Sequence, residues 1–143
     1  MGSWALGFDH GTKAEAAGLA ASTDLVALSG GSANNTKGAW TELVASTTEP
    51  YDALIVSLQG GDDTTQGTGQ ILLDIGIGPA GSEIVAVGDT IGSIANSEEV
   101  RMAATGVYPV NVPRGSRIAA RWQGQVATTS GLDAIVHGIR PAA

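Results

Sequence analysis

Residues 70–77 read Gln70-Ile71-Leu72-Leu73-Asp74-Ile75-Gly76-Ile77. Successive side chains of a β-strand point to opposite faces, so an extended chain places Ile71, Leu73, Ile75 and Ile77 together on one face. This alternation predicts a half-buried strand whose isoleucine and leucine side chains face a core. It is the clearest period-two segment of the chain.

Short runs rich in strand-forming residues recur along the chain from about residue 24. Clusters of Gly, Asn, Ser and Asp separate them, as turns between strands do. With residues 70–77 they give about eight predicted strands, the others lying at residues 25–28, 40–46, 54–59, 83–87, 106–112, 116–123 and 132–139. In the run at 116–123 we expect Ile118, Ala120 and Trp122 to face inward and Arg117 and Arg121 to face outward.

The sequence contains no convincing long helix. Residues 97–104 have a serine N-cap, acidic residues in the first turn and a nearby glycine, which suit either a two-turn helix or an irregular loop. The pattern predicts an all-β fold, a two-layer antiparallel sandwich of jelly-roll type. We expect six residues to be buried between its sheets: Trp40, Ile71, Leu73, Ile75, Ile118 and Trp122.

The first 22 residues differ from the rest in being rich in Gly and Ala. They predict an extended N-terminal arm (1–22) in front of one sandwich domain (23–143). The arm carries Trp4, Leu6 and Phe8, large side chains for which a free tail has no use. We expect these three residues to dock on this domain or on a neighbouring subunit.

The amino-acid composition limits the kinds of functional site that the chain can form. The 143 residues fit one domain, but Leu, Ile, Val and Phe number only 32, which predicts a thin core. Zero cysteines exclude disulfides and thiolate sites, and two histidines exclude a three-histidine metal site within one chain. A net charge of −7 disfavours nucleic-acid binding. No signal peptide or membrane span is recognisable, so we expect a soluble protein without cofactor or membrane contact.

Two motifs, one rich in glycine and one acidic, are each compatible with an ordinary turn as well as with a binding site. Residues 76–81 match the letters of a dinucleotide-binding fingerprint, but a β-rich segment follows where a helix is needed, so a hairpin turn is predicted. Asp62 and Asp63 lie in the most polar loop, where they either help to bind a hard cation or form a solvated turn. His137 falls in a strand, and no nucleophile elbow is present, so we expect no enzymatic activity.

Three stretches resemble the small β-sandwich virion proteins of tailed bacteriophages. They are ANNTKGAWTELVAS (33–46) with YDALIV (51–56), ILLDIGIG (71–78) with GSEIV (81–85), and YPVNVPRGSRIAAR (108–121). The resemblance covers most of residues 30–140. It implies a structural role without catalytic residues, in the head, neck, tail or fibre of the particle.

On this resemblance we expect a capsid decoration or cement protein. It would be made in the host cytoplasm and would bind the major capsid protein on the outer surface of the virion. Because a thin core gains stability from subunit contacts, we expect a homo-oligomer, with a trimer as first choice. The alternatives are a tail, neck or fibre component, with a tail protein as partner, and a carbohydrate-binding module that uses an exposed tryptophan as its stacking platform.

Overall fold

The computed structural model describes residues 14–16, 26–60, 69–95, 99–102, 107–125 and 131–140. The described residues form strands joined by turns and loops, and none of them is helical. The strands are β1 (Ala14–Ala16), β2 (Val26–Ser29), β3 (Thr41–Val44), β4 (Tyr51–Gly60), β5 (Gly69–Ile77), β6 (Ile84–Ala95), β7 (Glu99–Met102), β8 (Val107–Val112), β9 (Ile118–Gly124) and β10 (Gly131–Ile139).

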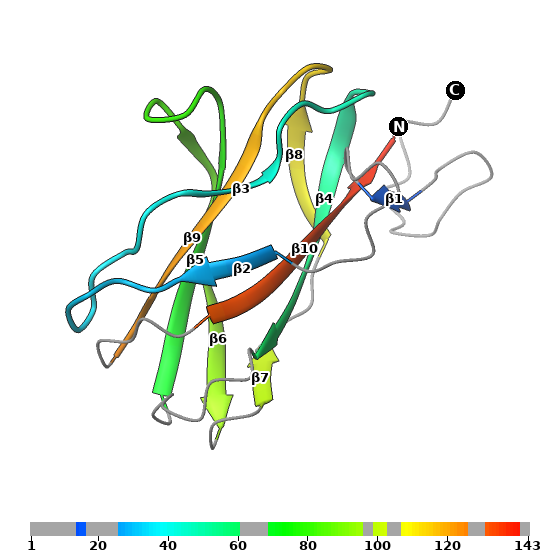
Figure 1. Cartoon of the computed structure of the whole chain (residues 1–143). Coiled ribbons are helices and arrows are strands. Elements are labelled where there is room, and N and C mark those ends of the chain that lie inside the picture. Colours follow the sequence, from blue (N-terminus) through cyan, green and yellow to red (C-terminus); the bar gives the residue numbers. More distant parts are fainter. Residues whose placement is uncertain are drawn as a thin grey trace.

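The strands form two five-stranded antiparallel sheets (Figure 1). The first sheet has the order β1-β10-β4-β8, with β2 also paired to β10, and the second has the order β3-β9-β5-β6-β7. Without the short strands β1 and β7, the sheets read β2-β10-β4-β8 and β3-β9-β5-β6. This interleaving of eight strands is that of a jelly roll, so the predicted all-β sandwich is confirmed.

The eight predicted strands correspond to β2–β6 and β8–β10, and two further strands lie at sheet edges. β1 comes from the predicted arm and pairs with β10, Glu15 lying opposite Gly138. β7 falls where the sequence suited a two-turn helix or an irregular loop, and both expectations are wrong for residues 99–102. The twelve-residue strand β6 offers an open edge of backbone groups, and a helix of two turns has little stability of its own. Residues 99–102 therefore pair with β6.

The core lies between the two sheets. Of the six residues expected there, Ile71, Leu73 and Ile75 on β5 and Ile118 and Trp122 on β9 are buried. They pack with side chains from the first sheet, among them Leu28, Leu54, Val56, Leu132, Ala134 and Val136. Trp122 also links the sheets, because its indole Nε1 donates a hydrogen bond to the carbonyl oxygen of Leu28 at 3.0 Å.

One end of this core depends on a close approach between β4 and β10. The ring of Tyr51 lies so near Gly138 that a Cβ atom on Gly138 would clash with Tyr51 Cδ1. Tyr51 is itself buried and belongs to the core cluster. A side chain at position 138 would therefore displace the tyrosine ring.

The glycine-rich run at residues 76–81 joins β5 to β6 as a hairpin, as expected. Its turn uses Gly78 and Gly81 at φ 130° and 79°, conformations that side chains disfavour. The amide of Ser82 donates to the carbonyl oxygen of Pro79 at 2.9 Å and closes the turn. The chain continues into a strand, so the dinucleotide-binding interpretation finds no support in the local structure.

Candidate functional site

The outer face of the second sheet carries an ion-pair network centred on Asp74. Leu73 and Ile75 point into the core, so strand alternation directs Asp74 outward, yet Asp74 is only 4% exposed. Its Oδ1 atom accepts from Lys37 Nζ at 2.7 Å, and its Oδ2 atom accepts from Arg121 Nε at 2.9 Å. Two cations thus enclose one buried carboxylate.

A bulge in β6 completes the network. The register of β5 and β6 shifts between Leu73 and Ile75, which pair with Thr90 and Val87. The inserted residues include Asp89, at a φ of 51°. Its amide donates to Asp74 Oδ1 at 3.0 Å, and its own carboxylate pairs with Lys37 Nζ at 2.9 Å. The bulge therefore turns a backbone donor toward the buried charge.

These contacts lower the pKa of Asp74. Burial alone would raise the pKa, but the hydrogen bonds from the Asp89 amide, Lys37 and Arg121 outweigh it, so the pKa lies below the ordinary value of 3.8. A carboxyl group with a depressed pKa stabilises the fold fully above its unfolded-state pKa. That contribution is lost as the pH falls through the lower, folded-state pKa.

We therefore expect acid lability from this network. The melting temperature should show no contribution from Asp74 titration between about pH 7 and 5, and should begin to fall below about pH 4, where Asp74 takes up a proton in the unfolded chain before it does so in the folded protein. Thermal melts at a series of pH values measure this effect. The variant Asp74→Asn has no charge to lose, so it should be less stable at neutral pH and decline less steeply below pH 4. A parallel decline in both proteins would contradict the assignment.

Trp40 lies on this outer face and not in the core, so its predicted burial between the sheets is wrong. Its side chain is half-buried and lies over Gly76, where a Cβ atom would come within 2.8 Å of the indole ring. The guanidinium group of Arg121 stacks on the same ring, 4.4 Å from its centroid. Gly76 pairs with Ala119 on β9, and these small residues leave a hollow that the indole fills.

A second ion-pair group continues the network along β9. Arg117 donates through Nε to Glu42 and through Nη1 to Glu83, each at 2.7 Å. Burial would raise the pKa of Glu83, but hydrogen bonds from its own amide and from Arg117 lower it overall. The hydrogen bond to Glu42 is the main cause that raises the pKa of Arg117. We call these seven residues the charged face: Lys37, Glu42, Asp74, Glu83, Asp89, Arg117 and Arg121.

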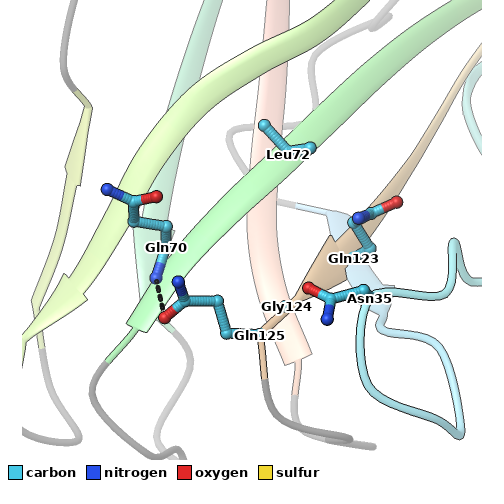
Figure 2. A pocket seen from close by; sticks show the side chains of 6 residues that line it. All are labelled: Asn35, Gln70, Leu72, Gln123, Gly124 and Gln125. Atoms are coloured by element: carbon cyan, nitrogen blue, oxygen red, sulfur yellow. Dashed lines mark hydrogen bonds between the residues drawn. The ribbon is translucent and has the colours of Figure 1, made fainter.

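Beside the charged face, where β5 begins and β9 ends, lies a small pocket (Figure 2). It has a volume of about 130 Å³. Its lining is formed by Asn35, Gln70, Leu72, Gln123, Gly124 and Gln125. Figure 2 shows Gln70 and Gln125 on one side of the pocket and Asn35 and Gln123 on the other. The pocket has no signal in the sequence, because its residues lie far apart along the chain.

The outer face of the first sheet is chemically different. Leu54 and Val56 point into the core, so Ile55 between them points away from it. The registers place Ile55 beside His137 and Val107 in one row across the sheet. Ile135 and Ile139 follow on the same side of β10. We call Ile55, Val107, Ile135 and Ile139 the aliphatic face; all four are half-buried and lie outside the core cluster.

Several residues singled out in the sequence fall outside the described residues. These are Trp4, Leu6 and Phe8 of the arm and the two loop aspartates Asp62 and Asp63. Within the described ranges, no group of three or more His, Asp or Glu side chains is placed to hold a metal ion. Over the same part of the chain, no helix is long and apolar enough to cross a bilayer.

Comparison with protein-family models, curated proteins and solved structures found no match to this chain.

Proposed function

We propose that the protein is a structural virion protein of a tailed bacteriophage, and that it decorates and cements the outer surface of the head. The virion assignment rests on the three sequence stretches that resemble phage β-sandwich proteins. The observation that carries an assembly role is the aliphatic face. A sandwich needs apolar side chains only on its inner faces, so aliphatic residues on an outer face indicate a contact surface.

Strand β1 lies beside the aliphatic face. β1 pairs with the edge of β10, with Ala14 opposite Ile139. The arm carries Trp4, Leu6 and Phe8, which have the size and apolar character of interface anchors. We propose that the face and the arm together make the contacts between copies, in a homo-oligomer for which a trimer is the first choice, and with the major capsid protein.

The charged face is poorly suited to contacts with other proteins. Each of its seven residues has at least one partner of opposite charge within 2.9 Å. Charges paired in this way give little energy to a new contact, because they would have to leave their present partners or lose water. We propose that this side of the domain faces away from the capsid. A cementing role requires no catalytic group, so we propose that the protein is not an enzyme.

The oligomer is the first point to test. Val107→Lys places a charge on the aliphatic face, and it should reduce the mass measured by sedimentation from that of an oligomer to that of a monomer. Val85→Lys is the matched control, because Val85 is a 45% exposed valine on the second sheet. Deleting residues 1–10 should also weaken the oligomer and the binding to undecorated heads. An unchanged mass in both Val107→Lys and the deletion would refute this use of the face and the arm.

Placement on the particle requires a separate measurement. Immunogold labelling of virions from the phage that carries the protein should mark the head surface. Labelling confined to tails would overturn the capsid placement in favour of a tail, neck or fibre component with a tail protein as partner. Absence from purified virions, together with glycan binding, would favour a carbohydrate-binding module.

A further inference from the structure

The amide-lined pocket has a composition that selects one class of ligand. Four of its six lining residues are Asn35, Gln70, Gln123 and Gln125. Each carboxamide presents both donors and an acceptor, and none carries a charge. A ligand that complements this lining must itself donate and accept hydrogen bonds at several adjacent positions. Vicinal hydroxyl groups have this property.

The nearest charged group does not make the pocket ionic. Lys37 borders it, because its Nζ atom donates to the carbonyl oxygen of Leu72 at 3.3 Å. The same ammonium group is bound by Asp74 at 2.7 Å and Asp89 at 2.9 Å, so its charge is already neutralised. With a net charge of −7, the protein also disfavours anionic ligands. These electrostatics favour a neutral ligand.

Backbone contacts hold the pocket walls in place. Asn35 is fixed to the end of β9 because its amide donates to the carbonyl oxygen of Gly124 at 2.9 Å. On the other wall, the amide of Gln125 donates to the carbonyl oxygen of Gln70 at 3.2 Å. In return the Gln70 amide donates to Gln125 Oε1 at 3.4 Å, shown as the dashed line in Figure 2. The walls are therefore formed before a ligand arrives, which reduces the entropy cost of binding.

We infer that this pocket binds a single neutral pyranose ring. The two pairs of amides bond its hydroxyl groups, and Leu72 contacts its C–H surface. The volume of about 130 Å³ is below the roughly 300 Å³ of ordinary small-molecule sites, which limits the ligand to one ring, such as the terminal sugar of a glycan. A ligand of this size corresponds to a dissociation constant of roughly 1 mM. The inference does not depend on where the protein assembles.

The test is a nuclear magnetic resonance titration of the full chain, labelled with nitrogen-15. The probes are the methyl glycosides of glucose, galactose and mannose, each added to about 100 mM, roughly a hundred times the expected dissociation constant. At least one should shift the side-chain NH₂ signals of Asn35, Gln70, Gln123 and Gln125 along saturable curves. N-acetylglycine methylamide, which offers peptide groups instead of hydroxyls, should not.

Substitutions of pocket residues test whether the glycoside-induced shifts arise from binding in the pocket. Gln123→Ala and Asn35→Ala should each weaken binding about tenfold, the effect of losing one good hydrogen bond. Asn111→Ala is the matched control, because Asn111 is an exposed amide on β8 of the other sheet, and it should leave binding unchanged. The inference is overturned if no glycoside gives saturable shifts at the pocket amides, if only the peptide analogue does, or if both pocket variants bind as tightly as the parent.

Discussion

Replacing Trp122 by alanine is expected to lower the free energy of unfolding by about 3–5 kcal/mol. The side chain is 0% exposed and is the largest of the fully buried residues. Its removal loses apolar burial and leaves a cavity between the sheets. It also leaves the carbonyl oxygen of Leu28 without the indole donor that bonds it at 3.0 Å. Chemical denaturation with urea measures the loss.

Trp40→Ala is the matched comparison, since it removes the same side chain from the outer face. Trp40 is half-buried and stacks on Arg121, so we expect a loss of only about 1–2 kcal/mol. Equal losses for the two tryptophans would contradict the placement of Trp122 inside the sandwich and Trp40 outside it. Trp122→Phe should fall between these values, because it keeps an aromatic ring and loses the hydrogen bond.

Asp74→Ala is expected to cost about 2–3 kcal/mol at neutral pH. Removing one partner of a buried ion pair leaves the other charge uncompensated, which commonly costs 3–5 kcal/mol. The side chains of Lys37 and Arg121 are 17% and 30% exposed, and the water that reaches them reduces the penalty. Asp52→Ala, which removes an exposed carboxylate from β4, should change stability by less than about 0.5 kcal/mol.

A double-mutant cycle separates the network from the loss of a side chain. Lys37→Met removes the cation that is closest to Asp74, at 2.7 Å. If the two groups are coupled, the double variant should be more stable than the sum of the single losses predicts, by about 1 kcal/mol or more. Strict additivity would show that the ion pair contributes nothing to stability. The same urea denaturation supplies all four measurements of the cycle.

The fold was largely predictable because two of its strands, β5 and β9, direct side chains into the core at alternate positions. The period-two run in β5 placed Ile71, Leu73 and Ile75 on one face, and the structure buries all three. The alternation in β9 likewise separated Ile118 and Trp122 from Arg117 and Arg121. Strand β7 could not be predicted from the sequence, because residues typical of helix caps flank residues 99–102. Their strand conformation comes from pairing with the end of β6. That pairing is tertiary information.

The candidate sites could be predicted from the sequence less well than the fold. Alternation directs Asp74 outward, but its partners lie 37, 15 and 47 residues away along the chain. Trp40 was assigned to the core because apolar strand residues are normally buried. The hollow that receives it is made by Gly76 and Ala119 from two other strands, and only the register brings those two small residues together. The pocket amides likewise come from three separate stretches of chain.

The strand order of the sandwich also determines when the domain can fold as the chain is synthesised. Among the described strands, β2 pairs with β10 alone and β3 pairs with β9 alone, so these two early strands cannot pair until two of the last strands have been synthesised. The hairpin of β5 and β6 is able to form early, because its strands are adjacent along the chain. The sheets close only after residue 139 has left the ribosome, and until then the edges of β4 and β5 and the core leucines remain open to wrong partners. Folding of this domain therefore waits for its last strand, is slowed by its long-range pairings, and leaves apolar segments exposed to aggregation until β10 is available.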